Sequence, residues 1–460
     1  MSSTLLRSAV RSKKLHRRIT APLVFFTIAG LALAGCSSSG GGGTASDKGP
    51  GDAGKADGNV TVYTTISGTE ASLYEDSWAD WEKKNKISIK LESSKEFEAQ
   101  IKIRAQGGNA PDLAIFPQPG LLADLASRNL IQPLAPSVAA NVKKYWTKDW
   151  AKYSTVGGTL YSAPFMANVK GWVWYSPANF AKWGVTPPKT FDELMTLTKT
   201  IQQKTGKAPW CAGFGSDAAT GWPGTDWVED LVLRQAGTDT YDKWVSHKIP
   251  FTDPAIKKAF DTVGSILKDP KYVNAGYGEG DVKSIVSTQF GDVARVLGNG
   301  TCPMTKQGSF FDGFISDPKN GNAKVGPDAD IWAFMLPPVD ASKGQAVTGG
   351  GESVGAFSND ADTIKVQEYL SSPEFANSRV KLGGVISANN GLKPESASSP
   401  ILQESIKILT DPSTTFRFDA SDLMPGVVGS GTFWTGIVDW MNGKSTDDVL
   451  STIDKSWPAN

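Results

Sequence analysis

Tryptophan is the residue type whose abundance first indicates a chemistry in this sequence. The chain contains 15 Trp among 460 residues, well above the number expected of an average chain of this length. Large aromatic side chains usually fill hydrophobic cores. Their faces also stack on the apolar C–H faces of pyranose rings, while Asp, Glu, Asn, Gln or Arg bind the hydroxyl groups. A surplus of Trp therefore suits carbohydrate binding.

A basic segment, an apolar run and a cysteine follow one another near the start of the chain. The basic residues lie within 7–18, the apolar run covers 21–33, and Leu33-Ala-Gly-Cys36 follows. This order is typical of a secretory signal, and the small residue before Cys36 indicates a lipobox. We therefore expect a signal peptide over 1–35, lipidation at Cys36 and a location on the outer face of the cytoplasmic membrane. An N-terminal membrane helix is the alternative, but about a dozen apolar residues are too few to cross a bilayer.

Cysteine and histidine are scarce, which limits the possible chemistry. With Cys36 lipidated, Cys211 and Cys302 remain, and in an oxidising compartment we expect them to form a disulfide. Two separate buried thiols are the alternative. The chain has 2 His, of which His16 falls in the signal and His247 remains. Zinc sites built on two or three histidines are thus excluded, and no nucleophile elbow accompanies His247. We predict no metal site, no cofactor and no catalytic residue.

Charge and composition limit the kinds of partner that the mature chain could bind. Loss of the signal removes six basic and no acidic residues, so 41 Lys and Arg face 47 Asp and Glu, a net charge of −6. A mildly acidic protein is a poor candidate for binding nucleic acid or an anionic lipid surface. Residues 36–58 are mainly Ser, Gly, Ala, Asp and Lys, which predicts a flexible tether with a typical reach of about 25 to 30 Å.

The first part of the body reads as alternating strands and helices. Apolar patterns predict strands over 60–64, 87–91 and 109–116, separated by helices over 70–84 and 97–105. This alternation is typical of a parallel sheet covered by helices. In such sheets ligands bind beyond the carboxyl ends of the strands. The loops in that position run over 65–70, 93–96 and 116–120.

A second α/β unit follows. Residues 161–175 read as one long strand, and Thr190 with Glu193 forms a capping box that begins a helix ending near Lys204. Further helices are predicted near 223–236, 254–268 and 281–297, and further strands near 208–214, 301–307 and 330–336. After the Gly349-Gly-Gly351 run we expect a short strand and then helices near 360–382, 399–409, 432–441 and 446–457.

Several motifs, in this order, are spread over nearly the whole mature chain. They are Ala110-Pro-Asp-Leu-Ala-Ile-Phe116, Leu121-Leu-Ala-Asp-Leu125, Ile131-Gln-Pro-Leu134, Leu160-Tyr-Ser-Ala-Pro164, Trp174-Tyr-Ser-Pro177, Pro188-Lys-Thr-Phe-Asp-Glu-Leu194, Gly349-Gly-Gly-Glu352 and Gly431-Thr-Phe-Trp434. None of them is specific alone. Their order and spacing, together with the lipobox, resemble the extracellular solute-binding proteins of ABC importers that carry maltose and α-glucosides.

The resemblance implies an α/β, two-lobed periplasmic-binding-protein fold of type II-like kind, in which the chain crosses between the lobes more than once. Lobe 1 would take residues 59–166 and 340–386, and lobe 2 would take 167–339 and 387–460, with the first crossing near 166–170. A sugar would be held in the cleft between the lobes. Closure of the lobes about a hinge would be the ligand-driven change that the importer senses.

In lobe 1 the resemblance implies binding roles for residues in the three loops. Phe116 ends its strand where the family often has an aromatic ring on the sugar face, and Gln118 follows it. An acidic residue that is common in that loop is missing here. Glu70 would accept hydrogen bonds from sugar hydroxyls, although an acid in the first turn of a helix also stabilises the helix dipole. Glu96 is a weaker candidate of the same kind.

In lobe 2 the resemblance points to polar residues near the crossing and to stacking platforms. Asn168 and Lys170 lie near the crossing, and the candidate platforms are Trp222, Phe310 and Trp434, each of which could instead be a core aromatic. The three glycines centred on Gly350, with Glu352 after them, would let the backbone approach the sugar. They lack the Lys-Ser/Thr of a phosphate loop, so nucleotide binding is not expected.

Together these features predict a non-enzymatic, lipid-anchored receptor that binds a malto- or α-gluco-oligosaccharide and delivers it to ABC permease subunits. We expect it to act as a monomer. Two alternatives stay open. One is a secreted glycoside hydrolase, which needs two carboxyl groups and no histidine, although no barrel-like βα repeat is present. The other is the same scaffold binding a different solute, such as a polyol.

Overall fold

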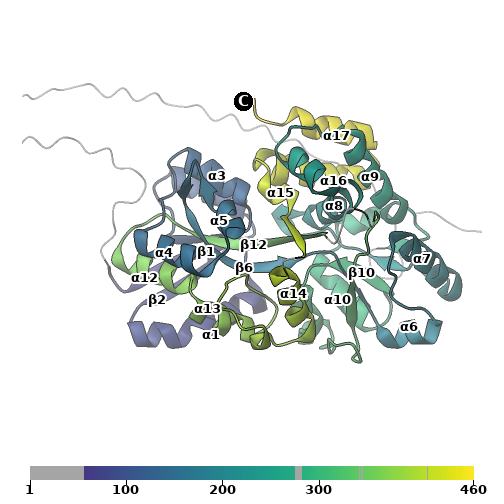
Figure 1. Ribbon diagram of the computed structural model, residues 1–460, viewed down its shortest axis with the longest axis horizontal. Helices are drawn as coiled ribbons and strands as arrows, with labels where there is room; N and C mark the ends of the chain where they lie inside the picture. Colours follow the sequence, from purple (N-terminus) through teal and green to yellow (C-terminus); the bar gives the residue numbers. More distant parts are fainter. Residues whose placement is uncertain (1–55, 275–281, 341, 343–345, 412, 460) are drawn as a thin grey trace, which may run out of the picture. The chain divides into compact units, whose positions relative to one another are not determined.

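The computed structural model describes residues 56–274, 282–340, 342, 346–411 and 413–459 (Figure 1). The predicted signal peptide, Cys36 and most of the predicted tether lie outside this part of the chain. Within the described ranges, no helix combines the length and the apolar character that crossing a membrane requires.

The first sheet has six strands in the order β13-β12-β3-β1-β2, and β6 also pairs with β12. These strands are β1 (Asn59–Thr64), β2 (Ser88–Ser93), β3 (Leu113–Phe116), β6 (Ser162–Val169), β12 (Ala346–Ala356) and β13 (Thr415–Phe418). β1 pairs in parallel with both β2 and β3, and the connections contain α1 (Gly68–Asn85) and α2 (Phe97–Gln106). The predicted parallel α/β arrangement is thereby confirmed.

β12 connects distant parts of the first sheet. It runs antiparallel to β3 and β6 and parallel to β13. A β-bulge between Gly351 and Ser353 takes Glu352 out of the regular register, and bulges of this kind re-aim side chains. A Cβ atom on Gly349 or Gly351 would overlap a carbonyl oxygen of β6. These two glycines therefore serve the close approach of two strands.

The second sheet has five strands in the order β11-β7-β10-β8-β9. They are β7 (Trp172–Tyr175), β8 (Trp210–Cys211), β9 (Val273–Asn274), β10 (Met304–Gln307) and β11 (Trp332–Met335). Successive residues of β7 pack on opposite faces: Val173 belongs to a cluster that includes α8 (Trp222–Val245), and Trp174 to one that includes α10 (Val293–Gly298). Figure 1 accordingly shows α8 and α10 on opposite sides of β10.

The long strand predicted over 161–175 is wrong, because the chain forms two strands there. β6 belongs to the first sheet and β7 to the second, and Lys170 and Gly171 lie between them. Gly171 adopts φ +82°, a conformation that L side chains rarely adopt, and this breaks the strand. The Lys170 N–H still donates to the carbonyl of Thr348 at 2.9 Å. The chain therefore passes from one sheet to the other directly after the predicted crossing at 166–170.

Several helix predictions also differ from the structure. The helix expected over 281–297 is divided into the short helices η2 (Val282–Val286), η3 (Phe290–Asp292) and α10. The helix expected over 360–382 is divided into α12 (Ala361–Leu370) and α13 (Pro373–Lys381), because Pro373 has no N–H to continue the first helix. The pattern of 415–418 gave no strand prediction, yet β13 pairs with β12. The predicted lobe ranges stay predictions.

The remaining α-helices and one π-helix cover the two sheets or connect their strands. They are α3 (Pro119–Ser127), α4 (Pro136–Tyr145), α5 (Lys148–Tyr153), α6 (Pro177–Trp183), α7 (Phe191–Thr205), α9 (Pro254–Leu267), α11 (Phe311–Ser316), α14 (Pro400–Thr410), α15 (Ala420–Leu423), the π-helix η7 (Val427–Phe433), α16 (Trp434–Met441) and α17 (Thr446–Lys455). The predicted cap of α7 is present, since the Thr190 hydroxyl accepts from the Glu193 N–H at 3.2 Å.

The predicted disulfide is confirmed. Cys211, at the end of β8, is bonded to Cys302, which precedes β10, and 91 positions separate the two in sequence. Both cysteines are buried, and β8 pairs in parallel with β10. The bridge therefore closes a long loop that contains α8, α9 and β9.

Candidate ligand-binding site

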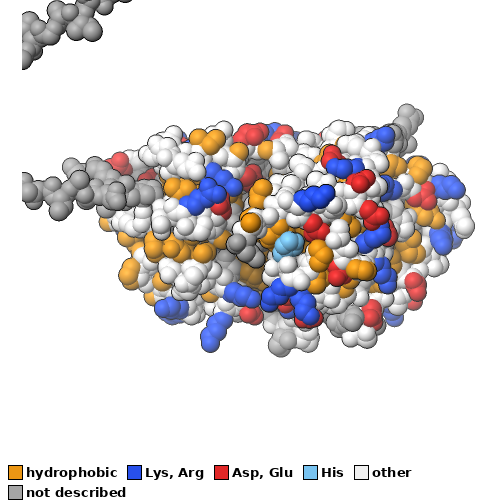
Figure 2. Space-filling view, turned by 90° about the horizontal axis from the view of Figure 1, so that it is seen from above, with side chains coloured by type: hydrophobic (Ala, Val, Ile, Leu, Met, Phe, Trp, Pro, Cys, Tyr) orange, Lys and Arg blue, Asp and Glu red, His pale blue; other side chains and the backbone are white. Residues whose placement is uncertain are grey.

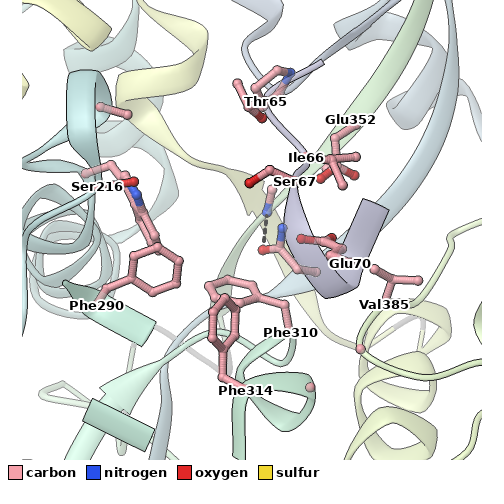
Figure 3. A pocket seen from close by; sticks show the side chains of 18 of the residues that line it. Thr65, Ile66, Ser67, Glu70, Ser216, Phe290, Phe310, Phe314, Glu352 and Val385 are labelled. Atoms are coloured by element: carbon pink, nitrogen blue, oxygen red, sulfur yellow. Dashed lines mark hydrogen bonds between the residues drawn. The ribbon is translucent and has the colours of Figure 1, made fainter. Parts of the chain in front are cut away.

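A cavity of about 550 Å³ lies where loops of the first sheet meet elements of the second (Figure 3). This volume falls within the range of small-molecule sites. The first-sheet lining includes 65–70 after β1, Lys95 after β2, and Pro117 and Gln118 after β3. These are the loops singled out by the rule that ligands bind beyond the carboxyl ends of parallel strands.

Nine of the eleven binding residues predicted from the sequence line this cavity. They are Glu70, Gln118, Asn168, Lys170, Trp222, Phe310, Gly350, Glu352 and Trp434. The structure thus brings together residues from both sheets that lie far apart in the chain. Their contact with a ligand remains a prediction.

Phe116 and Glu96 do not line the cavity. Phe116 is 1% exposed and packs on Phe97 and Phe357, with ring centroids 5.7 and 6.3 Å apart. As the last residue of β3 its side chain belongs to the core, and the cavity is lined instead by Pro117 and Gln118, which follow it. Glu96 is exposed at the start of α2. In that loop, Lys95 is the residue that lines the cavity.

One wall of the cavity is an acidic cluster around Lys170. The Lys170 Nζ atom lies 2.7 Å from Asp226 Oδ2 and 2.9 Å from Asp419 Oδ2, and all three side chains are buried. Glu229 lies behind them and accepts from the N–H groups of Ala420 and Ser421 at 2.8 and 3.2 Å. Because Glu229 caps the start of α15, this network joins α8 to α15 through charged groups.

The protonation of this acidic cluster follows from burial and from the excess of carboxyl groups. Burial alone would lower the pKa of Lys170, but the carboxylates of Asp226 and Asp419 outweigh it and raise the pKa. Burial and then Asp226 raise the pKa of Glu229 to about 7. Burial likewise raises the pKa of Asp419 and of the neighbouring Asp422 well above the ordinary range. Lys170 is therefore charged, and burial opposes the ionisation of Glu229, Asp419 and Asp422.

The acidic cluster also has the composition of a metal site, since ligand atoms of Asp226, Glu229 and Asp419 lie within 4.8 Å of one another. The ammonium group of Lys170, however, is bonded to two of these three carboxyl groups. A cation already stands where a metal ion would bind. The donor set thus does not fit a metal ion.

A second polar group lies on the first-sheet side of the cavity. Glu70 is in the first turn of α1, Glu352 is at the β12 bulge, and Arg379 is on α13. Arg379 is fully buried, and its guanidinium carbon lies 4.3 Å from the ring centre of Tyr74. Burial and then the Glu70 carboxyl raise the pKa of Glu352 to about 7, and burial raises the pKa of Glu70 despite Arg379.

Aromatic rings form the third part of the lining. Trp222 contacts Phe290 and Phe310, with ring centroids 4.9 and 5.9 Å apart, and Phe290 contacts Phe314 at 5.1 Å. Figure 3 shows Phe310 and Phe314 between Phe290 on one side and Glu70 on the other. Lys170 Nζ lies 4.7 Å from the centre of a Trp222 ring, a cation–π contact. Aromatic faces and carboxyl groups therefore border one space.

Trp434 lines the cavity and lies at the junction of a π-helix and an α-helix. It begins α16 directly after the π-helix η7, and π-helical turns often occur at functional sites. Its side chain is 3% exposed, and its Nε1 atom has no hydrogen-bond partner among the residues that the structure describes. Gly221 packs against the Trp434 backbone so closely that a Cβ atom there would overlap it. The main chain at Trp434 is therefore packed tightly against Gly221.

Other lining residues were not predicted from the sequence. They include Glu98, Asp226, Phe290, Phe314, Arg379 and Asp419. Glu98, in the first turn of α2, accepts from the Gln118 amide in the loop after β3 at 3.0 Å. Arg379 occupies an ordinary position inside a helix, where a basic residue gives no signal. Asp226 lies four positions after Trp222, which was predicted to be a stacking platform, so proximity to that platform was the available signal.

His247 lies away from these groups. Its side chain is partly exposed. Figure 2 shows side chains of both charges interspersed on the face of the molecule drawn there. The His247 ring stacks on Trp457 at 4.1 Å, and its Nε2 atom lies 3.6 Å from Asp454. The residue does not line the cavity, and these contacts join the end of α8 to α17.

Comparison with known proteins places the chain in a family. Residues 65–374 match the model of the bacterial extracellular solute-binding proteins. The chain is 37% identical over 415 residues to the alpha-glucosides-binding periplasmic protein AglE of Rhizobium meliloti. The aligned residues cover 86% of each chain. It is 36% identical over 417 residues to the osmoprotective compounds-binding protein GgtB of Synechocystis, covering 89% of this chain and 95% of that one.

Solved structures agree on the fold. The bacterial solute receptor AcbH, described as preferring β-D-galactopyranose, superposes with a TM-score of 0.73 at 19% identity, covering 86% of this chain and 97% of that one. The GacH receptor of Streptomyces glaucescens, solved with acarbose, gives a TM-score of 0.67 at 18% identity, covering 87% and 99%. Both are receptors of the fold predicted from the sequence. This chain belongs to the bacterial extracellular solute-binding protein family.

Proposed function

We propose that this protein is the sugar-binding receptor of an ABC importer. It captures a malto- or α-gluco-oligosaccharide by closure of two lobes and delivers it to the permease subunits as a monomer. The observation that carries the proposal is the cavity, in which aromatic faces from Trp222, Phe310 and Trp434 border the carboxyl groups of Glu70 and Glu352. Pyranose rings need this pairing of apolar faces and hydroxyl acceptors. The similarity to AglE supports the α-glucoside ligand.

Calorimetric titration against a panel of sugars tests the proposal. The panel contains maltose, maltotriose, trehalose, sucrose, a β-glucoside and a galactoside. We expect saturable binding that is strongest for an α-glucoside. Absence of heat for every sugar, with the protein shown to be folded, would contradict a sugar receptor.

A different solute on the same scaffold is the second candidate. The similarity to GgtB, whose name refers to osmoprotective compounds, favours a small polyol-type ligand. Sorbitol and glycerol therefore belong in the same titration. If a polyol binds at least tenfold more tightly than any sugar of the panel, the oligosaccharide assignment is replaced.

Catalysis is the competing class of function, and Glu352 gives it a specific basis. A carboxyl group whose pKa is raised to about 7 could act as a general acid, as one carboxyl does in glycosidases. Incubation with maltotetraose distinguishes the two classes. We expect the concentration of reducing ends to stay constant over a day, because we propose a binding protein. Reducing ends that increase with time would replace the receptor by a hydrolase.

We expect Trp434→Ala to weaken affinity for the preferred sugar at least tenfold, on the order of 1.4 kcal/mol, because it removes a stacking face. Calorimetric titration of the variant measures this loss, and thermal unfolding shows whether the fold is kept. Trp81→Ala is the matched control, since Trp81 stacks on Tyr369 and does not line the cavity. Wild-type affinity in Trp434→Ala would remove Trp434 from the site.

The lipid anchor at Cys36 completes the proposal. We expect Cys36→Ser to release the protein into the soluble fraction while sugar affinity stays within twofold of the wild type. The reason is that the anchor and the cavity belong to separate parts of the chain. Membrane fractionation and titration of the released protein measure the two effects. Retention of Cys36→Ser in the membrane fraction would contradict the anchor.

A further inference from the structure

Two polar contacts cross the mouth of the cavity. Lys95 Nζ, after β2, lies 2.8 Å from Asp217 Oδ2 in the short helix η1 (Asp217–Ala219). The Thr69 hydroxyl, in the first turn of α1, donates to Asp317 Oδ2, directly after α11, at 3.3 Å. In each contact one partner follows a strand of the first sheet, and the other belongs to the segments around the second sheet. The two contacts therefore join opposite walls of the cavity.

Exposure places these contacts at the rim of the cavity. All four residues line it, yet the side chains of Lys95 and Asp217 are 68% and 41% exposed, whereas Lys170 on the acidic wall is buried. Figure 3 shows Ser216, the residue before Asp217, on the opposite side of the cavity from Glu70. The contacts therefore lie at the outer edge of the cavity, toward solvent.

The backbone holds Asp217 in an uncommon conformation. Its φ of +50° lies in the left-handed region, which few residues other than glycine adopt, although Asp and Asn are enriched there. The Thr220 hydroxyl and N–H donate to the Asp217 carbonyl at 2.7 and 3.2 Å, and the Ser216 N–H donates to the Thr220 hydroxyl at 3.0 Å. Conformations of this kind persist where the surroundings determine them, and they cluster at functional sites. The acidic partner of the ion pair thus stands on a hydrogen-bonded turn.

We propose that the Lys95–Asp217 and Thr69–Asp317 contacts form a gate that limits the length of the sugar the cavity accepts. This inference rests on the proposed function and names the substrate class of the same site, sugars of two or three rings. With about 550 Å³, the cavity has the volume of an ordinary small-molecule site, about 300 to 1,000 Å³. A short sugar fits beneath the gate. A longer chain has to extend past the rim, where it displaces the two contacts.

The gate discriminates because only a long ligand has to break it. An exposed ion pair and a single hydrogen bond are each weak, but losing both at once lowers affinity by about tenfold, the product of two small factors. A sugar that fits beneath the gate also has to pass it when it leaves. The same contacts therefore slow the dissociation of short ligands, and salt should weaken this effect because it screens exposed charges.

The length limit is tested with α-1,4-linked glucose chains of two to five rings, whose affinities are measured by calorimetry. We expect the wild type to bind maltotetraose and maltopentaose at least tenfold more weakly than the better of maltose and maltotriose. Lys95→Ala removes the ion pair and shortens the side chain at the rim. It should therefore reduce this ratio of affinities at least threefold.

Dissociation is tested with whichever sugar of the panel binds best, by stopped-flow tryptophan fluorescence. Lys95→Ala and Asp217→Asn should each accelerate dissociation about two- to fivefold, the usual range for an exposed ion pair. Asn also tolerates the left-handed backbone at this position. The double variant should be no faster than either single one, because both remove the same contact. Raising the NaCl concentration should accelerate dissociation in the wild type but not in the double variant.

Lys243→Ala is the matched control. Lys243 forms an exposed ion pair with Asp239 at 2.7 Å, and neither residue lines the cavity, so its affinity ratio and dissociation rate should be those of the wild type. Thermal unfolding checks that every variant keeps its fold. A wild type that binds maltopentaose as tightly as maltose would overturn the gate while leaving the receptor intact. So would a dissociation rate that both Lys95→Ala and Asp217→Asn leave unchanged. Absence of binding by every sugar would overturn both the gate and the proposed function.

Discussion

Lys170→Met lowers the free energy of unfolding by about 3 to 5 kcal/mol at pH 8, the usual cost of removing one partner of a buried ion pair. The reason is that Lys170 compensates Asp226 and Asp419 by direct contact, while Asp422 and Glu229 lie close by. The variant leaves these carboxyl groups buried without a cation. Urea unfolding followed by circular dichroism measures the loss.

The loss of unfolding free energy caused by Lys170→Met should depend on pH, and the direction of this pH dependence follows from the raised pKa values. Burial already raises the pKa of Asp419, Asp422 and Glu229 above their unfolded values, and removal of the cation raises them further. The folded state of the variant then binds more protons than the unfolded state, so its stability falls as the pH rises. We expect the variant to be closest to the wild type near pH 5.

Lys319→Met is the matched control, because Lys319 is an exposed lysine on the cavity rim. Its unfolding free energy should stay within about 0.5 kcal/mol of the wild type, as is usual for surface substitutions. A Lys170→Met variant as stable as Lys319→Met at pH 8 would contradict the compensating role. So would a loss that is the same at pH 5 and pH 8.

Removal of the disulfide should lower the free energy of unfolding by a similar amount. The double variant Cys211→Ala, Cys302→Ala should lose about 4 to 5 kcal/mol of unfolding free energy, because the bridge spans 91 positions and its main effect is on the unfolded chain. The wild type unfolded under reducing conditions should show the same loss. Urea unfolding with and without reductant measures both.

The folded site should be little affected by that double variant. Cys211 and Cys302 do not line the cavity, so sugar affinity at low temperature is expected to stay within threefold of the wild type. A loss of stability below about 1 kcal/mol would mean that the unfolded chain is already constrained by other contacts. A large loss of affinity would mean that the bridge holds the cavity wall in place.

The elements that the sequence predicted well are those with local signals. β1, α1, β2 and α2 follow from apolar periodicity, and α7 follows from the Thr190 cap and Gly206. The break between β6 and β7 was missed because the apolar residues of 161–175 were read as one run despite Asn168, Lys170 and Gly171. Which sheet each half joins depends on distant partners, such as Thr348 for Lys170. β13 was missed for a similar reason, since a strand of four residues is defined by its pairing with β12.

The residues of the candidate site likewise differ in whether the local sequence indicates them. Loops that follow parallel strands can be recognised from local sequence, which is why Glu70 and Gln118 were predicted at positions that line the cavity. Phe116 was misplaced by the alternation of the strand, because a shift of one residue moves a side chain to the other face. Asp226 and Arg379 were missed because a charged residue in a helix is usually solvated. Only the packing of α8 and α13 against other parts of the chain shows that these two are buried.

The strand order of the first sheet has a consequence for how the chain folds. β12 pairs with β3 and β6, which come far earlier in the sequence, so residues 346–356 must be made before this part of the sheet can form. Pairing between such distant segments is slow, because the entropy of closing the loop is lost before the contacts form. A chain still being synthesised therefore stays incompletely folded until late. That is the state in which a polypeptide can be exported across a membrane.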